Sequence, residues 1–178
     1  DSLVRTILSQ NTTDRTSARA FASLKEKLPT WEAVLAAPNE IVEDAIREGG
    51  LAEIKTARVK TILQTVKDEQ TVPAPLSLEH LRELPTDQVK RYLTSFKGVG
   101  PKTVSCVLMF TLGRAEFPVD THVWHIAKKL RWVPPNATRE TTYEHLNRRI
   151  PSDLKYDLHV LLVTAACSHS RGPRGGHR

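Results

Sequence analysis

The segment of the sequence best suited to chemistry is Phe96–Lys102 (FKGVGPK), in which two glycines and a proline precede a lysine. Glycine reaches positive φ and allows close backbone approach, as a tight hairpin between two helices requires. Pro101 suits the first turn of a helix, where its missing N–H breaks no hydrogen bond. The free N–H groups of such a hairpin and helix start would point outward. They would bind phosphate oxygens without reading a base sequence.

The same segment can also be read as a plain turn between two packed helices, and the Gly-Val-Gly pattern alone does not separate these interpretations. Its basic neighbours favour phosphate: Lys97 and Lys102 flank the glycines, and Lys90 and Arg91 precede them. The expected phosphate contacts are therefore Lys97, Gly98, Val99 and Gly100.

Helical periodicity dominates the rest of the chain. Apolar residues recur at helix spacing from Leu3 to Leu8 and again at Ile54, Ala57, Ile62, Leu63 and Val66. Further helices are expected near residues 31–35, 41–46, 78–84, 89–96, 102–112, 121–130, 139–149 and 154–166. No alternating run bounded by hairpin signals occurs, and we interpret residues 160–163 as part of a core helix. The expected fold class is all-α.

Composition narrows the class of protein. The 178 residues, 39% hydrophobic and 26% charged, suit one or two small soluble domains. No apolar run could span a bilayer, so we expect no membrane partner. The net charge is +6, but Arg171, Arg174 and Arg178 supply three of these charges, so it favours a polyanionic partner only weakly. Two cysteines, Cys106 and Cys167, are too few for a disulfide framework and suggest a reducing compartment.

Four stretches together resemble the endonuclease III branch of helix-hairpin-helix DNA glycosylases. They are Leu8–Asp14 (LSQNTTD), Gly49–Leu51 (GGL), Phe96–Lys102 and Phe117–Val123 (FPVDTHV). The family places a lysine just after the hairpin and an aspartate eighteen residues later, the separation of Lys102 and Asp120 here. Details such as Gln10-Asn11 resemble plant-type members most closely.

The resemblance implies an enzyme that removes a DNA base. Lys102 would attack C1′ of the deoxyribose as the nucleophile, and Asp120 would be the essential carboxylate. The amine must be neutral to attack, and both partial burial and a helix N-terminus disfavour its ammonium form. Asp120 also has a structural interpretation as the N-cap of the helix beginning at Thr121, and the two roles are compatible.

Two further residues would replace the extruded base. By resemblance, Asn11 falls where the family commonly has a gap-filling glutamine, and Leu51 falls at the position of a wedge leucine. In a purely structural interpretation, Leu51 is instead a core residue at a helix start. Asp14 also matches the family, although a helix N-cap would explain it.

The family fold is two helical lobes with a DNA cleft between them. Residues 18–121 would form a six-helix barrel lobe with the hairpin, and residues 1–17 with 122–169 a second, incomplete lobe. Residues 170–178 are polar and glycine-rich, so a disordered tail is expected. The family's iron–sulfur cluster is expected to be absent, because its first ligand would fall near His169 or Ser170 and no suitable thiols follow. No metal site is expected elsewhere.

Three functions are compatible with the sequence. The first is a glycosylase with AP-lyase activity on oxidised or modified pyrimidines. The second is a monofunctional glycosylase that uses water, and the third is a catalytically silent DNA-binding module. The expected partner is double-stranded DNA carrying a damaged or modified base, bound by a monomer. The expected compartment is the nucleus, with an organelle as the alternative.

Overall fold

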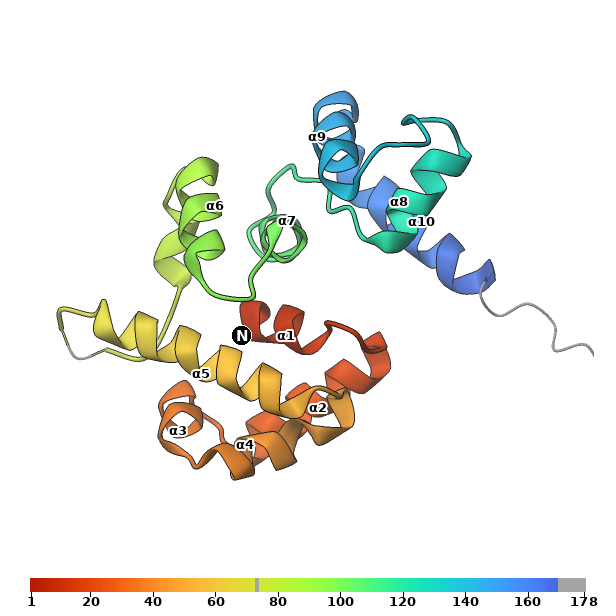
Figure 1. Cartoon of the computed structure of the whole chain (residues 1–178). Coiled ribbons are helices and arrows are strands. Elements are labelled where there is room, and N and C mark those ends of the chain that lie inside the picture. Colours follow the sequence, from red (N-terminus) through yellow and green to blue (C-terminus); the bar gives the residue numbers. More distant parts are fainter. Residues whose placement is uncertain (73, 170–178) are drawn as a thin grey trace, which may run out of the picture. The chain divides into compact units, whose positions relative to one another are not determined.

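The computed structural model describes residues 1–72 and 74–169, the last three of them without side chains. All elements in these ranges are helical, which confirms the all-α fold class (Figure 1). In chain order they are α1 (Ser2–Leu8), α2 (Asp14–Lys27), α3 (Trp31–Ala36), α4 (Asn39–Ile46), the 3-10 helix η1 (Arg47–Gly49), α5 (Ala52–Asp68), the 3-10 helix η2 (Glu79–Arg82), α6 (Thr86–Ser95), α7 (Pro101–Phe110), α8 (Thr121–Lys129), α9 (Arg139–Arg149) and α10 (Lys155–His169).

The chain divides into two compact units, one ending at Val107 and the other beginning at Leu108, within α7. The lobes expected from the resemblance group the chain differently, because they join residues 1–17 to the later half. In the structure α1 packs against α2 and α5 of its own unit. The lobe boundaries stay a prediction, and the expected tail at 170–178 lies outside the described residues.

None of the described helices combines the length and apolarity needed to cross a membrane.

The first unit is built around α5, its longest helix, which packs against α1, α3 and α4 (Figure 1). Ile62, Leu63 and Val66 point into the core, as the periodicity predicts. Ala57 of the same predicted face is exposed, and Val59, which the pattern did not include, is buried. The first turn of α5 departs from the pattern. Ile54 is 47% exposed, whereas the side chain of Lys55 is only 1% exposed. A polar residue therefore takes the inward position at this end of the helix.

In the second unit α8 packs against α9 and α10. Its core includes Phe117, Val123, Leu146 and Leu162. The predicted helix over residues 160–163 is confirmed as part of α10. Its core position is only partly correct, because Leu161 is 63% exposed while Leu162 is 7% exposed.

Side-chain caps set where several helices begin. Thr13, rather than the predicted Asp14, caps α2: the Thr16 backbone N–H donates to Thr13 Oγ1 at 3.2 Å. Thr138 forms a reciprocal capping box with Thr141 at the start of α9. Such caps satisfy N–H groups that have no acceptor within their own helix, typically worth about 1 kcal/mol each.

Candidate functional site

The hairpin, residues 96–100, joins α6 to α7. Phe96 and Val99 anchor it with side chains that are each 4% exposed. Both glycines are exposed, but only Gly100 faces open space, because Gly98 takes φ +86° with the Arg58 side chain against it. The Val104 N–H donates to Gly100 O at 3.0 Å, which places Gly100 at the N-cap of α7. The glycine hairpin expected from the sequence is confirmed.

The outer side of the hairpin has the features of an anion site. Lys97 and Lys102 are both exposed. Lys102 is the second residue of α7, in the first turn, where backbone N–H groups lack intrahelical acceptors. The partial burial expected for Lys102 is wrong, since its side chain is open to solvent. The side chain of Val99 is buried and its N–H donates to Phe96 O at 3.1 Å, so its part in phosphate binding stays a prediction.

Two other segments carry exposed residues in the left-handed region. Asn11 has φ +54° in the first loop, residues 9–13, and Leu51 has φ +52° in the second loop, residues 47–51. Leu51 is 49% exposed, so its interpretation as a core residue is wrong. A non-glycine residue costs about 1–2 kcal/mol in this conformation. Such residues persist only where surrounding contacts hold them, and they cluster at functional sites.

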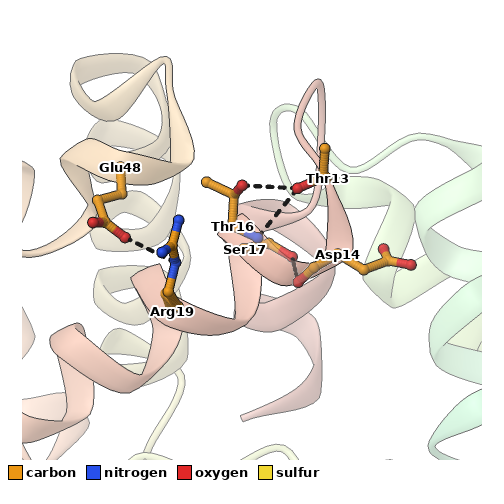
Figure 2. A network of polar contacts seen from close by, with 6 residues as sticks. All are labelled: Thr13, Asp14, Thr16, Ser17, Arg19 and Glu48. Carbon is orange, nitrogen blue, oxygen red and sulfur yellow. Dashed lines mark hydrogen bonds and ion pairs between the residues drawn. The ribbon is translucent and has the colours of Figure 1, made fainter. Parts of the chain in front are cut away.

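Polar contacts join α2 to the first and second loops (Figure 2). The first loop ends at the cap Thr13, whose hydroxyl also contacts Thr16 Oγ1 at 2.7 Å. Arg19 Nε pairs with Glu48 Oε2 at 3.3 Å and so links α2 to the second loop. Both partners are largely exposed, so this ion pair contributes little to stability.

A buried lysine lies between the same two loops. Lys55 Nζ donates to Leu8 O, just before the first loop, and to Gly49 O in the second, both at 2.8 Å. Desolvation by burial lowers the pKa of Lys55, and the nearby charge of Arg58 lowers it further. The two carbonyl bonds offset part of the penalty for burying a cation.

Gln10 connects the first loop to the hairpin. Its Nε2 atom donates to Thr103 Oγ1 at 3.2 Å and to Gly98 O at 3.5 Å, while its Oε1 atom accepts from Arg58 Nη1 at 2.8 Å. The Arg58 side chain also covers Gly98, where an added Cβ would lie 2.5 Å from Arg58 Nε. The hairpin is therefore fixed against α5 through contacts that the local sequence pattern does not reveal.

In the second unit, Asp120 caps α8. Its Oδ1 atom accepts from the Val123 N–H at 2.8 Å, which confirms the predicted capping role. Capping fixes one carboxylate oxygen and leaves the other available for chemistry. Lys102 belongs to the first unit and Asp120 to the second, so their meeting across a groove stays a prediction.

The segment that leads to Asp120 is held by buried and half-buried polar side chains. Glu116 Oε2 accepts from Tyr143 OH at 2.6 Å and from Asn147 Nδ2 at 3.1 Å. Lys155 Nζ donates to Asn147 Oδ1 at 2.9 Å. Hydrogen bonds in a low-dielectric interior restrict geometry strongly. This network, which sequence reasoning missed, orients the backbone four residues before Asp120.

Comparison with known proteins identifies the family. Residues 4–152 match the model of the "HhH-GPD superfamily base excision DNA repair protein". The chain belongs to this superfamily. The hairpin, Lys102 and Asp120 all lie within the matched HhH-GPD region, as do both loops.

Individual relatives of the chain are named as DNA glycosylases. The chain is 56% identical over 164 residues to the Arabidopsis thaliana protein named "Putative DNA glycosylase At3g47830", covering 92% of this chain and 55% of that protein. It is 35% identical over 143 residues to "DNA glycosylase/AP lyase ROS1" of the same plant, covering 77% of this chain and 10% of that protein. The chain therefore spans about half of the first relative and a small part of the second.

The fold of the chain matches that of a solved endonuclease III structure. The trapped endonuclease III–DNA covalent intermediate superimposes with a TM-score of 0.75 at 25% identity, covering 91% of this chain and 70% of that one. The expected helix-hairpin-helix glycosylase fold is thereby confirmed.

The iron–sulfur cluster that the family resemblance implies does not fit the residues of this chain. A four-iron cluster takes four thiolates, and the 178 residues hold two cysteines. Cys106 is buried within α7, and the side chain of Cys167 is outside the described part. Among the side chains that the structure describes, no group of three His, Cys, Asp or Glu could hold a metal ion.

Proposed function

We propose that this chain is a DNA base-excision glycosylase with AP-lyase activity that acts on oxidised or otherwise modified pyrimidines. The observation that carries the proposal is the exposed amine of Lys102, in the first turn of α7 directly behind the glycine hairpin. An amine placed beside phosphate-binding amides is positioned for the sugar of the nucleotide whose phosphates those amides hold.

The hairpin would anchor the duplex by its phosphates. The amides at the start of α7 and the side chain of Lys97 would contact phosphate oxygens, which gives affinity without base specificity. The target nucleotide must leave the helical stack to reach the amine. Leu51 would enter the gap as a wedge, and Asn11 would contact the base left without a partner.

Base removal would begin with attack of Lys102 Nζ on C1′. The N–C1′ bond forms, the bond from C1′ to the base nitrogen breaks, and the base leaves with the electron pair and then takes a proton. Positive charge develops on the sugar in the transition state, and the fixed carboxylate of Asp120 would stabilise it or move protons. Burial of the site by DNA would strengthen this interaction.

Strand cleavage would follow from the same covalent bond. The amine loses a proton and the sugar ring opens, which leaves a Schiff base between Lys102 and C1′. The Schiff base acidifies the 2′ protons. Loss of one of them pushes out the 3′ phosphate with the C3′–O electron pair, a β-elimination. Water then releases the lysine. We propose that these steps use side chains of this chain alone, acting as a monomer on nuclear or organellar DNA.

Borohydride trapping on defined duplexes tests the proposal. Duplexes containing an abasic site or thymine glycol are incubated with the protein and borohydride, with undamaged DNA as the control. A covalent adduct that disappears in Lys102→Ala is the expected result. Base release without an adduct would instead indicate a monofunctional enzyme. Salt-sensitive binding with neither would indicate a silent DNA-binding module.

A further inference from the structure

The two loops and the hairpin all meet one end of a single helix. Lys55 and Arg58 are three residues apart on α5 and therefore lie on neighbouring positions of one helix face. Lys55 Nζ donates to Leu8 O, just before the first loop, and to Gly49 O in the second loop. Arg58 Nη1 donates to Gln10 Oε1, and the Arg58 side chain lies against Gly98. The three segments are far apart in sequence but share these two cations.

We propose that Lys55 and Arg58 are positioning residues that hold the first loop, the second loop and the hairpin as one rigid DNA-binding platform. The proposal rests on the proposed function, since it concerns how the same surface engages DNA. It adds that wedge insertion and phosphate anchoring are mechanically coupled through α5.

Backbone strain explains why the platform needs positioning residues. Leu51 is left-handed, a conformation that a leucine in a free loop would abandon, and Asn11 adopts the same region at a lower cost. Lys55 fixes the carbonyls of Leu8 and Gly49, three and two residues from these strained positions. An apolar side chain at position 55 could fill the same space but could not direct two carbonyl groups.

Coupling to the hairpin depends on Arg58. Its guanidinium accepts no hydrogen bond, so it orients Gln10 by donating to Oε1 and leaves Nε2 directed at the hairpin and at Thr103. Gln10 immediately precedes Asn11 in the chain. A shift of the hairpin on phosphate binding would thus be transmitted to the loop that carries Asn11.

The chain offers a matched control on the same helix. Lys60 is also a lysine of α5 that donates to a backbone carbonyl and a side-chain oxygen, those of Ala37 and Asn39. Its partners lie just after α3 and at the first residue of α4, outside all three segments. Lys60→Met removes the same kind of bonds without touching the platform.

Hydrogen exchange of the free protein tests the platform directly. Lys55→Met is expected to raise exchange about tenfold in both loops, and Arg58→Met in the first loop and the hairpin. Lys60→Met is expected to change none of the three, even if its midpoint of thermal unfolding falls equally. Equal exchange increases in Lys60→Met, or an effect of Lys55→Met on one loop alone, would overturn the proposal. If Lys55→Met does not fold, Gln10→Ala replaces it and must raise exchange in the hairpin.

The functional readout is the fluorescence of 2-aminopurine placed beside an abasic site, which reports unstacking. The platform predicts about a tenfold loss of the unstacked population in Lys55→Met, with Lys60→Met at the wild-type level. Failure of the wild-type protein to form a borohydride adduct would refute the proposed function. The hydrogen-exchange experiment would then still test whether the platform exists. A trapped wild-type adduct with unchanged fluorescence in Lys55→Met would refute the platform alone.

Discussion

The side chain of Arg58 occupies the space next to Gly98 that any Cβ atom at that position would need. The added Cβ would lie 2.5 Å from Arg58 Nε, and Gly98 also has φ +86°. Two separate constraints therefore select glycine, one from the backbone and one from a side chain of α5.

A double-mutant cycle separates these constraints. Gly98→Ala is expected to lower the free energy of unfolding by about 2–4 kcal/mol, combining the left-handed backbone cost with overpacking against Arg58. In an Arg58→Ala background the same change should cost only the backbone part, about 1–2 kcal/mol. Urea unfolding of the four proteins measures both values. Equal costs in the two backgrounds would show that Arg58 does not constrain Gly98.

Leu51→Asn is expected to separate stability from function. Asparagine tolerates the left-handed region better than leucine, and the leucine side chain is half exposed. The free energy of unfolding should therefore stay within about 0.5 kcal/mol of the wild-type value or rise. Loss of the wedge should reduce 2-aminopurine unstacking.

Ile54→Gln is the control for Leu51→Asn, because Ile54 is a similarly exposed apolar residue one turn further along α5. Its fluorescence response should match that of the wild-type protein. A large stability loss in Leu51→Asn would mean that this leucine packs into the protein, contrary to its exposure.

Two substitutions of Asp120 distinguish capping from catalysis. Asparagine keeps a carbonyl oxygen that can accept from the Val123 N–H, whereas alanine removes the cap and should lower stability by about 1 kcal/mol. Both should reduce the rate of base release by roughly 10²-fold or more, since both lack the charge. Single-turnover rates and thermal unfolding give the two readouts. Wild-type rates in Asp120→Asn would leave this residue with a structural role only.

Acid should weaken the contact between α3 and the chain before η2. The Leu76 N–H donates to Glu32 Oε1 at 2.6 Å, and this bond holds the pKa of Glu32 below its usual 4.5. A carboxyl with a depressed folded-state pKa contributes stability above pH 4.5 and loses it as pH falls through the folded value. The stability difference between wild type and Glu32→Gln should therefore shrink below pH 4.5. A difference that stays constant with pH would show that the charge is not responsible.

Local chemistry explains which parts of the site were predictable from sequence. The hairpin follows from two glycines and a proline, and the cap at Asp120 follows from an aspartate before a helical run. Both depend on neighbours within a few residues. Sequence alone does not decide the exposure of Leu51, because a leucine at a helix start can face either the core or the solvent.

The contacts that position these residues were not predictable in the same way. Periodicity predicts Ile54 on the inward face, yet Lys55 is buried because the carbonyls of Leu8, 47 residues away, and of Gly49 accept its hydrogen bonds. Gln10 and Gly98 are 88 residues apart in sequence. The one available signal was Gln10 itself, next to Asn11 in a stretch that matches the family. No local pattern reports a partner at such a distance.

The most direct test of the proposed activity is to locate the covalent bond to DNA. The borohydride-trapped adduct on an abasic duplex is digested with protease and nuclease, and the modified peptide is sequenced by mass spectrometry. The added deoxyribose mass should be found on Lys102. An adduct on Lys97, on another lysine or on the N-terminal amine would contradict the assignment of Lys102 as the nucleophile.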